Sequence, residues 1–358
     1  MKKILVLGAG LVAKPLVDYL AACDGVELTV ADIEAKKAAA LTRGYGSASA
    51  LGLDASDQGK VDELVSAHDL TVSLLPVTQH PNIARTCLRH GKHMTTASYI
   101  SPEVKDLDAE VKAAALTFIN ECGVDPGLDH MSALRVIYGA ERDGGKVLSF
   151  RSYCGGLPAP DANTNPMGYK FSWAPTGVLA AATAPARYLS NGNVVDVPGD
   201  ELFADPELVE LPGIGRFEGY PNRDALQYIE MYGLHDVETM FRGTLRNSGH
   251  CAAYYPWVKS GMLDRTERSD LDTLTYNDFM REIAGGAKDP KQTLAEMWRL
   301  ANDHPAIANL EWLGLFEETA VSLERGGNVD VMAKRMAEKC AYATGERDMI
   351  LMQHEFVV

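Results

Sequence analysis

The sequence has no long apolar run, no paired-cysteine motif and no excess of basic residues. None of its apolar stretches approaches the roughly 18 consecutive residues that a membrane-spanning helix needs. Its six cysteines are scattered without a Cys-x-x-Cys pair, so neither a zinc site nor a disulfide framework is indicated. The formal charge of −15 at pH 7 argues against a nucleic acid or an anionic membrane as partner. An anionic substrate therefore needs a local basic cluster, because the overall field repels it.

A chain of 358 residues is long enough for two domains, each with its own core. Its first residues enter an apolar strand at once, which leaves no room for a signal or transit peptide, and we expect a cytoplasmic protein. His90 and His93 have no third ligand nearby in the sequence, so no metal site is predicted.

The opening stretch predicts a binding site for nucleotide phosphates. The apolar residues 4–7 indicate a buried strand that ends at two glycines, Gly8 and Gly10, before a helix-compatible segment. Gly8 allows a tight turn, and Gly10 lets the backbone approach a pyrophosphate. The N–H groups that follow, from Leu11 and Val12 onward, supply donors and the positive end of a helix dipole.

A second strand strengthens the dinucleotide interpretation. Residues 26–31 predict a strand that ends at Asp32, about 20 residues beyond the glycines, where an acid holds the ribose hydroxyls. A carboxylate there faces a 2′-phosphate with like charge, so NAD is favoured as cofactor, with NADP possible. The alternative is that Asp32 only caps the next helix and leaves Lys36 and Lys37 for a phosphate.

Strands and helices then alternate up to about residue 125. The predicted strands cover residues 49–54, 69–76, 92–97 and 116–121, and the predicted helices cover residues 58–67, 81–90 and 102–115. Strands separated by helices of 10–15 residues are typical of parallel β-α units. We therefore predict an α/β fold with a Rossmann-type, doubly wound parallel sheet over residues 1–125.

Ligands of such sheets bind at the carboxyl ends of the strands, so the residues after each strand are candidates for the site. These candidates are Asp54, residues 75–80, Ser98, Tyr99 and residues 123–126. Among them, the residues expected to contact the cofactor are Asp54, Leu75, Ser98, Val124, Asp125 and Pro126.

The pattern changes near Asp125 and predicts a second, α+β domain over residues 126–358. A helix is expected at residues 128–138 and a long strand at residues 147–153, followed by less regular strands and helices. Residues 250–342 are mostly helical by pattern. The last strand, residues 348–358, must join an earlier sheet because it cannot stand alone.

Several motifs along the chain resemble those of one family. The most extensive are residues 152–160 and 165–173, and the others are residues 98–102, 125–130, 220–224, 242–246, 346–348 and 353–354. With these motifs the chain resembles the saccharopine dehydrogenase family, in particular its L-glutamate-forming members. The resemblance implies a small-molecule substrate, saccharopine, whose secondary amine is oxidised by a nicotinamide cofactor. Hydrolysis of the imine then gives glutamate and 2-aminoadipate semialdehyde, a reaction of lysine metabolism.

Two features differ from the fungal members of that family. They usually carry Cys-Arg-Thr after the second strand, an NADP signature, where this chain has Asp32, Ile33 and Glu34. The cofactor is therefore not carried over from the resemblance. The fungal chains also continue past the last strand with a segment that returns to the first domain. Its absence here predicts either a shortened version or a dispensable helix.

Saccharopine carries three carboxylates and two amines, so its pocket needs fixed cations. Arg223 and Arg246 lie in stretches that resemble substrate-contacting motifs of the family, and a guanidinium clamps a carboxylate with two hydrogen bonds. The alternative for each arginine is a solvated charge or an internal ion pair. Thr244 and the backbone of Leu245 also resemble substrate contacts. Two further cations are weaker candidates for substrate binding, Lys170 and Arg242. The alternative for both is that they only hold a strand in place.

Hydride transfer needs a deprotonated amine, and imine hydrolysis needs an acid and a base. Asp125 is the first candidate for this work, Tyr99 the second and Cys154 the third, and Ser98, Tyr99 and Asp125 are also expected to contact the substrate. The alternatives are a helix cap for Asp125, a core ring for Tyr99 and an inert thiol for Cys154. His130 is more often a structural residue in such a position.

Other functions remain open. One is oxidation of a different secondary amine or imine, as in carboxynorspermidine dehydrogenase or lysine 6-dehydrogenase. Another is a non-catalytic NAD-binding regulator. We expect a homodimer in either case.

Overall fold

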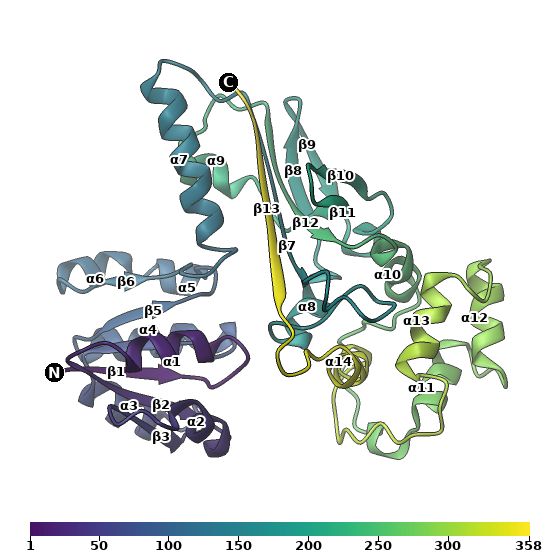
Figure 1. Ribbon diagram of the computed structural model, residues 1–358, viewed down its shortest axis with the longest axis horizontal. Coiled ribbons are helices and arrows are strands. Elements are labelled where there is room, and N and C mark those ends of the chain that lie inside the picture. Colours follow the sequence, from purple (N-terminus) through teal and green to yellow (C-terminus); the bar gives the residue numbers. More distant parts are fainter. The chain divides into compact units, whose positions relative to one another are not determined.

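The computed structural model describes residues 1–358 and divides into two compact units, Met1–Ser132 and Ala133–Val358. Figure 1 labels the helices and strands of both units. The division falls inside helix α7 (Leu128–Arg142), a few residues beyond the turn at which the sequence pattern changes. No helix is long and apolar enough to cross a membrane.

The first unit is built on a six-stranded sheet in which every neighbouring pair of strands is parallel. Its strands are β1 (Lys2–Leu7), β2 (Val26–Asp32), β3 (Ala48–Gly52), β4 (Leu70–Ser73), β5 (His93–Thr96) and β6 (Phe118–Ile119). The order β3-β2-β1-β4-β5-β6 reverses direction between β1 and β4. This confirms the predicted doubly wound sheet and places the topological switch point beside the glycine loop that follows β1.

Helices connect these strands much as the sequence predicts. They are α1 (Ala13–Ala21), α2 (Ala35–Thr42), α3 (Gln58–Ala67), α4 (His80–Arg89), α5 (Pro102–Lys105) and α6 (Asp108–Ala113), with a 3₁₀ turn at Val77–Gln79. The prediction of one continuous helix over residues 102–115 was wrong, because α5 and α6 are separate. The Leu107 N–H bonds to the carbonyl of Val104, only three residues back, and this tighter turn interrupts the α-helical ladder.

Strand β1 supplies both faces of the core of this unit. Leu5 and Leu7 pack with apolar residues of α3 and α4, whereas Ile4 and Val6 pack with residues of α1 and α2. Because successive side chains of a strand point to opposite faces, a continuous apolar run is needed when helices cover both faces. The opening sequence therefore encodes a central strand.

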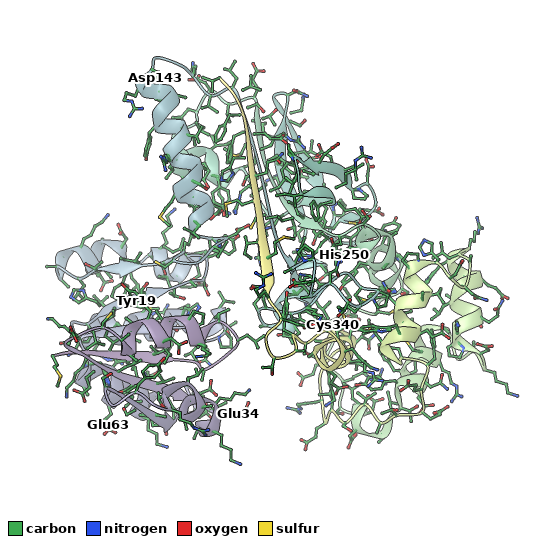
Figure 2. All side chains as sticks on the ribbon, in the orientation of Figure 1. Tyr19, Glu34, Glu63, Asp143, His250 and Cys340 are labelled. Atoms are coloured by element: carbon green, nitrogen blue, oxygen red, sulfur yellow. The ribbon has the colours of Figure 1, made fainter.

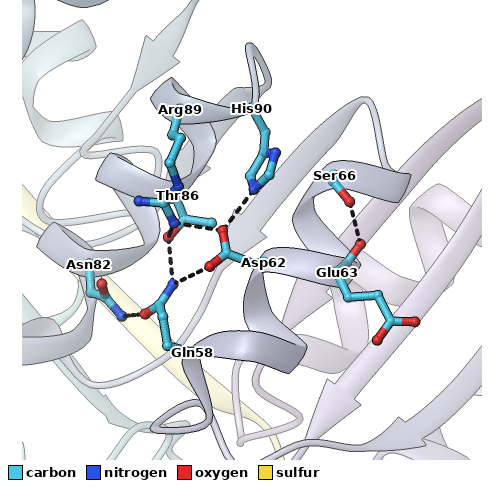
Figure 3. A network of polar contacts seen from close by, with 8 residues as sticks. All are labelled: Gln58, Asp62, Glu63, Ser66, Asn82, Thr86, Arg89 and His90. Carbon is cyan, nitrogen blue, oxygen red and sulfur yellow. Dashed lines mark hydrogen bonds and ion pairs between the residues drawn. The ribbon is translucent and has the colours of Figure 1, made fainter.

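A polar network joins α3 to α4 and to the residue that follows α4 (Figure 3). Asp62 accepts hydrogen bonds from Arg89 (2.6 Å) and lies 2.7 Å from His90 Nε2, and Gln58 donates to Thr86. The hydrogen bonds from Arg89 and His90 hold the pKa of Asp62 at about 2. The network fixes α3 and α4 to each other on the face of the sheet that they both cover.

The second unit contains a seven-stranded mixed sheet. Its strands are β7 (Ser149–Pro158), β8 (Ala186–Ser190), β9 (Asn193–Val197), β10 (Glu207–Leu211), β11 (Gly215–Pro221), β12 (Thr239–Arg246) and β13 (Asp348–Val357). The main order is β10-β11-β12-β7-β13, and only β12 and β7 are parallel. Strand β13 pairs with β7 along its whole length, which confirms that the last strand joins an earlier sheet.

The helices of this unit lie mostly in the predicted region, residues 250–342. They are α8 (Pro175–Ala181), α9 (Gln227–Tyr232), α10 (His250–Lys259), α11 (Tyr276–Ile283), α12 (Pro290–Trp298), α13 (Pro305–Leu313) and α14 (Asn328–Lys339), with 3₁₀ turns at Gly199–Glu201 and Leu271–Thr273. All of them except α9 contribute to one large apolar core. Its most voluminous buried side chain is Trp257, whose indole N–H donates to the Ala306 carbonyl. Figure 1 shows β13 in yellow, running beside β7.

Candidate active site

The loop between β1 and α1 has the form of a phosphate cradle. Gly8 adopts φ +103°, and a Cβ added there would lie 2.8 Å from the Leu74 carbonyl oxygen, so only glycine fits. A Cβ added at Gly10 would meet nothing within 4 Å, which leaves open space above the backbone. Leu11 and Val12 are exposed, and no side chain caps the first N–H groups of α1. These features fit a dinucleotide whose pyrophosphate lies against the loop.

Asp32 lies where the sequence places it, at the end of β2 and against the glycine loop. Its Oδ2 accepts the Ala9 N–H at 2.7 Å, and its Oδ1 accepts the Glu34 N–H at 2.8 Å. The N-cap residue of α2 is Glu34 rather than Asp32, so the capping alternative loses its support. Lys37 forms an ion pair with Glu34. The carboxylate thus occupies the place in which a Rossmann fold holds the ribose.

Other predicted cofactor residues also follow strands of the first sheet. Asp54 follows β3 and accepts the Ser56 N–H at 2.9 Å, and this hydrogen bond lowers its pKa. Leu75 follows β4 and packs against the core. Val124 is half-buried and Pro126 is buried, in the turn that precedes α7. Their contact with a cofactor stays a prediction.

Tyr99 and Asp125, the first two candidates for acid–base work, touch each other. The Tyr99 hydroxyl donates to Asp125 Oδ1 at 2.7 Å across 26 residues of sequence. The Gly127 N–H donates to Asp129 Oδ1 at 2.6 Å, beside the start of α7. Both groups are half-buried, so the Asp125 carboxylate can be reached by a ligand and can accept a proton from it.

His130 is engaged with acidic residues. Its Nε2 lies 2.9 Å from Glu121 Oε2, and its Nδ1 lies 3.6 Å from Asp129 Oδ2. Glu121 also accepts the Ile100 N–H at 3.0 Å. These contacts tie the start of α7 to the end of the first sheet, which agrees with a structural role for this histidine.

His80, which lies within the predicted range 75–80, has a defined place in the first unit. His80, at the start of α4, is 2% exposed and lies between Ser73 Oγ and Ser98 Oγ. Burial lowers the pKa of its imidazole, so the ring is neutral near pH 7. The sequence offers no signal for this contact, because the three residues come from different elements.

In the second unit, strand register brings several predicted substrate residues to one sheet face. Thr244 pairs with Tyr220 of β11 on one side and with Cys154 of β7 on the other. Arg242 and Arg246 lie two residues from Thr244 in β12, so they share its face. Leu245 points to the opposite face and is fully buried, so any contact between it and a substrate must come from its backbone.

Arg246 is a buried cation without an acidic partner. Arg246 is only 7% exposed. Its guanidinium carbon lies 5.0 Å from the centroid of the Tyr169 ring, and its Nη1 donates to the Leu245 carbonyl at 2.9 Å. The buried Nε has no hydrogen-bond partner. Glu218, its cross-strand neighbour, accepts instead from the N–H groups of Gly249 and Cys251. Because buried charges are normally paired, this guanidinium is suited to an incoming anion.

The rings around Arg246 are neutral, whereas Glu218 is its neighbour on the adjacent strand. Burial raises the pKa of Tyr220 to about 12. Burial, with a smaller contribution from Arg246, holds the pKa of His250 well below its usual value. His250 begins α10 (Figure 2) and stacks on Tyr254, with ring centroids 4.1 Å apart. A carboxylate that reaches Arg246 therefore meets a guanidinium beside neutral aromatic rings.

The other predicted cations differ from Arg246. Lys170 is buried and forms a 2.6 Å ion pair with Glu346, which ties it to the turn before β13. Arg242 is buried with its guanidinium 4.3 Å from the Tyr228 ring. Arg223 is exposed in the turn after β11, at φ +55°, and its carbonyl accepts the Arg187 N–H at 2.9 Å. A non-glycine residue in the left-handed backbone conformation, held by a backbone hydrogen bond, is the kind of strained residue found at functional sites.

The two units together define a two-domain protein of the Rossmann class, with a nucleotide-binding fold followed by a mixed-sheet domain. The model of the saccharopine dehydrogenase NADP binding domain matches residues 4–119, and that of the saccharopine dehydrogenase C-terminal domain matches residues 123–358. The chain belongs to the saccharopine dehydrogenase family.

Fungal and animal relatives agree with this membership. Saccharopine dehydrogenase [NADP(+), L-glutamate-forming] of Schizosaccharomyces pombe is 38% identical over 372 residues, which cover 100% of this chain and 82% of that enzyme. The mitochondrial alpha-aminoadipic semialdehyde synthase of Bos taurus is 39% identical, and the chain spans only 39% of its length. The apo structure of the histidine-tagged L-Glu-forming saccharopine dehydrogenase from Saccharomyces cerevisiae has a TM-score of 0.84 and 36% identity, covering 99% of this chain and 81% of that one.

Proposed function

We propose that this protein oxidises saccharopine at its secondary amine with a nicotinamide cofactor, giving L-glutamate and 2-aminoadipate semialdehyde. The observation that carries this proposal is Arg246, a buried guanidinium that has no carboxylate partner within its own unit. A substrate with three carboxylates supplies that partner. The fungal relatives, matched over about four fifths of their length, carry this activity in their names.

We assign the steps of this chemistry to particular residues. When bound, the cofactor supplies the hydride acceptor. Arg246 holds one substrate carboxylate, and Asp125, hydrogen-bonded to Tyr99, takes the proton from the substrate ammonium. After oxidation, water adds to the imine carbon and the C–N bond breaks, with the proton returning to the glutamate nitrogen. Asp125 and Tyr99 are suited to both proton transfers because one donates while the other accepts.

For the cofactor we propose NAD as the preferred form, with NADP accepted less well. The names of the fungal relatives and of the family's nucleotide-binding domain specify NADP. Two carboxylates, Asp32 and Glu34, follow β2 in this chain, and the nearby Lys37 is already paired with Glu34. A 2′-phosphate would meet like charge at this position. Lys36, which is exposed, is the cation that remains for NADP.

The test is the initial rate of saccharopine-dependent reduction of each cofactor by purified protein. We expect a higher kcat/KM with NAD than with NADP. In Arg246→Lys the KM for saccharopine should rise by roughly 10- to 100-fold, because a lysine cannot make the bidentate contact, while the KM for the cofactor stays nearly constant. Arg223→Ala should also raise the KM for saccharopine rather than for the cofactor.

Arg216→Met is the matched control, since Arg216 lies on the neighbouring strand β11 and makes an exposed contact with Glu210. It should leave both KM values unchanged. A selective loss of cofactor binding in Arg246→Lys would contradict the proposed role of this arginine. Cofactor binding without turnover of any amine would instead support a non-catalytic regulator.

We further infer a homodimer in the cytoplasm. Light scattering on the purified chain tests the assembly state, and a mass near 38.8 kDa would contradict the dimer.

A further inference from the structure

His80 connects two serines at the carboxyl ends of neighbouring strands. Its Nδ1 lies 3.0 Å from Ser73 Oγ at the end of β4, and its Nε2 lies 2.8 Å from Ser98 Oγ just after β5. Thr96 Oγ1 lies 3.4 Å from the same Nε2. Leu74, the residue after Ser73, has the carbonyl oxygen that leaves no room for a Cβ at Gly8. The imidazole thus lies beside the switch point of the sheet.

The hydrogen-bond partners of Ser73 determine the tautomer of this ring. Ser73 is fully buried, and His80 Nδ1 is the partner of its hydroxyl. If Nδ1 carried the proton, the Ser73 hydroxyl hydrogen would have no acceptor, which buried donors avoid. The buried Thr96 hydroxyl favours the opposite tautomer, but its 3.4 Å contact with Nε2 is longer than the 3.0 Å contact of Ser73 with Nδ1, so the Ser73 contact decides. Ser73 therefore donates to Nδ1. The single N–H of the neutral ring is then on Nε2, and it donates to Ser98 Oγ.

This tautomer leaves the Ser98 hydroxyl free to donate its hydrogen. With one lone pair of Oγ taken by His80, the Ser98 hydroxyl keeps its hydrogen to donate elsewhere. His80 is the partner of this oxygen within the protein, and the residue is half-buried rather than sealed. The Ser98 backbone is also fixed, because its N–H donates to Thr96 Oγ1 and its carbonyl accepts the Glu121 N–H. The hydroxyl is therefore a prepositioned donor at the edge where such sheets bind ligands.

We propose that His80 is a positioning residue that holds the Ser98 hydroxyl as a hydrogen-bond donor to an acceptor oxygen of the bound ligands. This inference rests on the proposed function for the identity of those ligands. The acceptor is a carbonyl or carboxylate oxygen, which is present both in the nicotinamide carboxamide and in the amino-acid substrate. A donor fixed before binding costs less to organise than a freely rotating one.

The tautomer is testable without any ligand. In protein labelled with ¹⁵N-histidine, the signals of His80 are those that disappear in His80→Gln. We expect them to show the neutral Nε2–H form near pH 7. A neutral Nδ1–H form, or a protonated ring, would overturn the proposal. This result is independent of whether saccharopine is the substrate, so it separates a failure of this inference from a failure of the proposed function.

Binding measurements identify the acceptor. Ser98→Ala and His80→Gln should each weaken the same ligand by roughly 3- to 10-fold, and the double variant should be no worse than either alone, because both remove one hydrogen bond. If the carboxamide is the acceptor, the Kd of the reduced cofactor rises while that of ADP-ribose, which lacks nicotinamide, does not. If a substrate carboxylate is the acceptor, only the KM for saccharopine rises.

His68→Gln is the matched control. His68 is also a buried histidine of the first unit, with Nδ1 2.6 Å from the Leu64 carbonyl and Nε2 2.9 Å from Thr29 Oγ1, but it precedes β4 instead of following it. It should lower the melting temperature without changing any Kd or KM. The proposal is overturned if His80→Gln behaves in the same way.

Should His80→Gln not fold, Ser73→Ala replaces it. This variant removes the donor to Nδ1, and we expect a mixture of both tautomers together with a loss of affinity of a few fold. An unchanged Nε2–H signal with unchanged affinity would equally overturn the proposal.

Discussion

At the scale of single residues, the absence of a counter-charge separates Arg246 from Lys170 and Arg335, two other buried cations of its unit. Lys170 has Glu346, and Arg335 has Glu317 and Glu338. Arg246 has only the carbonyl of its neighbour and the face of an aromatic ring. Burial of a guanidinium in this state costs stability, and a ligand carboxylate recovers that cost on binding.

Asp125 carries the first prediction at this scale. Asp125→Ala should lower turnover by roughly two to four decades, because it removes a general acid–base group or its positioning. Tyr99→Phe should have a smaller effect, about tenfold, since it removes only the hydroxyl that donates to Asp125. The cofactor Kd should be nearly unchanged in both variants. Steady-state kinetics and a cofactor titration measure these effects.

The control for this pair is Tyr19→Phe, on a tyrosine that is 70% exposed on α1. It should have the activity of the unmodified protein. Full activity of Asp125→Ala would remove this residue from the mechanism.

At the scale of secondary-structure elements, β13 depends on contacts made before it begins. Lys170 is buried and its ammonium lies 2.6 Å from Glu346, and the Glu346 carboxylate also accepts the Ala343 N–H at 2.7 Å. These bonds shape the turn from which β13 enters the sheet beside β7. The hydrogen bond from Lys170 lowers the pKa of Glu346.

We therefore predict that Lys170→Met lowers the melting temperature by roughly 3–10 °C at neutral pH. Because the folded-state pKa of Glu346 is depressed, the stabilisation is complete above the ordinary pKa of 4.5 and is lost as the pH falls through the lowered value. The difference between variant and unmodified protein should therefore shrink in acid. Thermal unfolding at several pH values measures it.

Lys112→Met is the matched control for this element. Lys112 pairs with Asp108 on an exposed helix surface, where an ion pair contributes little. Equal losses of melting temperature in the two variants would contradict the role given to the buried pair.

At the scale of the whole molecule, each unit is one continuous stretch of chain with its own sheet and core. Such units are able to fold alone. The contiguous first unit contains the glycine loop, Asp32 and the His80 contacts, all of which it forms from its own residues.

We predict that a fragment of residues 1–142, which keeps α7 whole, folds and binds the reduced cofactor with a Kd within about tenfold of the full chain. Gly10→Val in this fragment should abolish binding with little change in the melting temperature, because a Cβ at this position meets no protein atom within 4 Å and the side chain fills the space above the loop. Gly46→Val, at another glycine with open space, should bind normally. Calorimetry and fluorescence titration measure both. A folded fragment that does not bind would show that cofactor binding needs residues of the second unit.

The sequence by itself determined the architecture of the first unit and the family. An apolar run, two glycines and an acid at the end of the next strand are local signals, since strands, turns and helices depend on neighbours a few residues away. The same reasoning brought Tyr99 and Asp125 into one list, because both follow strands of one sheet. It predicted one continuous helix over residues 102–115 and missed the break, which a single tightened turn produces.

Only the tertiary structure decided which charged and polar groups are already paired. Lys170 meets Glu346 across 176 residues of sequence, whereas Arg246 meets no carboxylate at all, and nothing in the local sequence of either cation distinguishes them. The pairing of Ser73, His80 and Ser98 likewise depends on two strands and a helix meeting at one edge. The physical reason is that a counter-charge or a hydrogen-bond partner is supplied by strand order and register, which bring together residues distant in the chain.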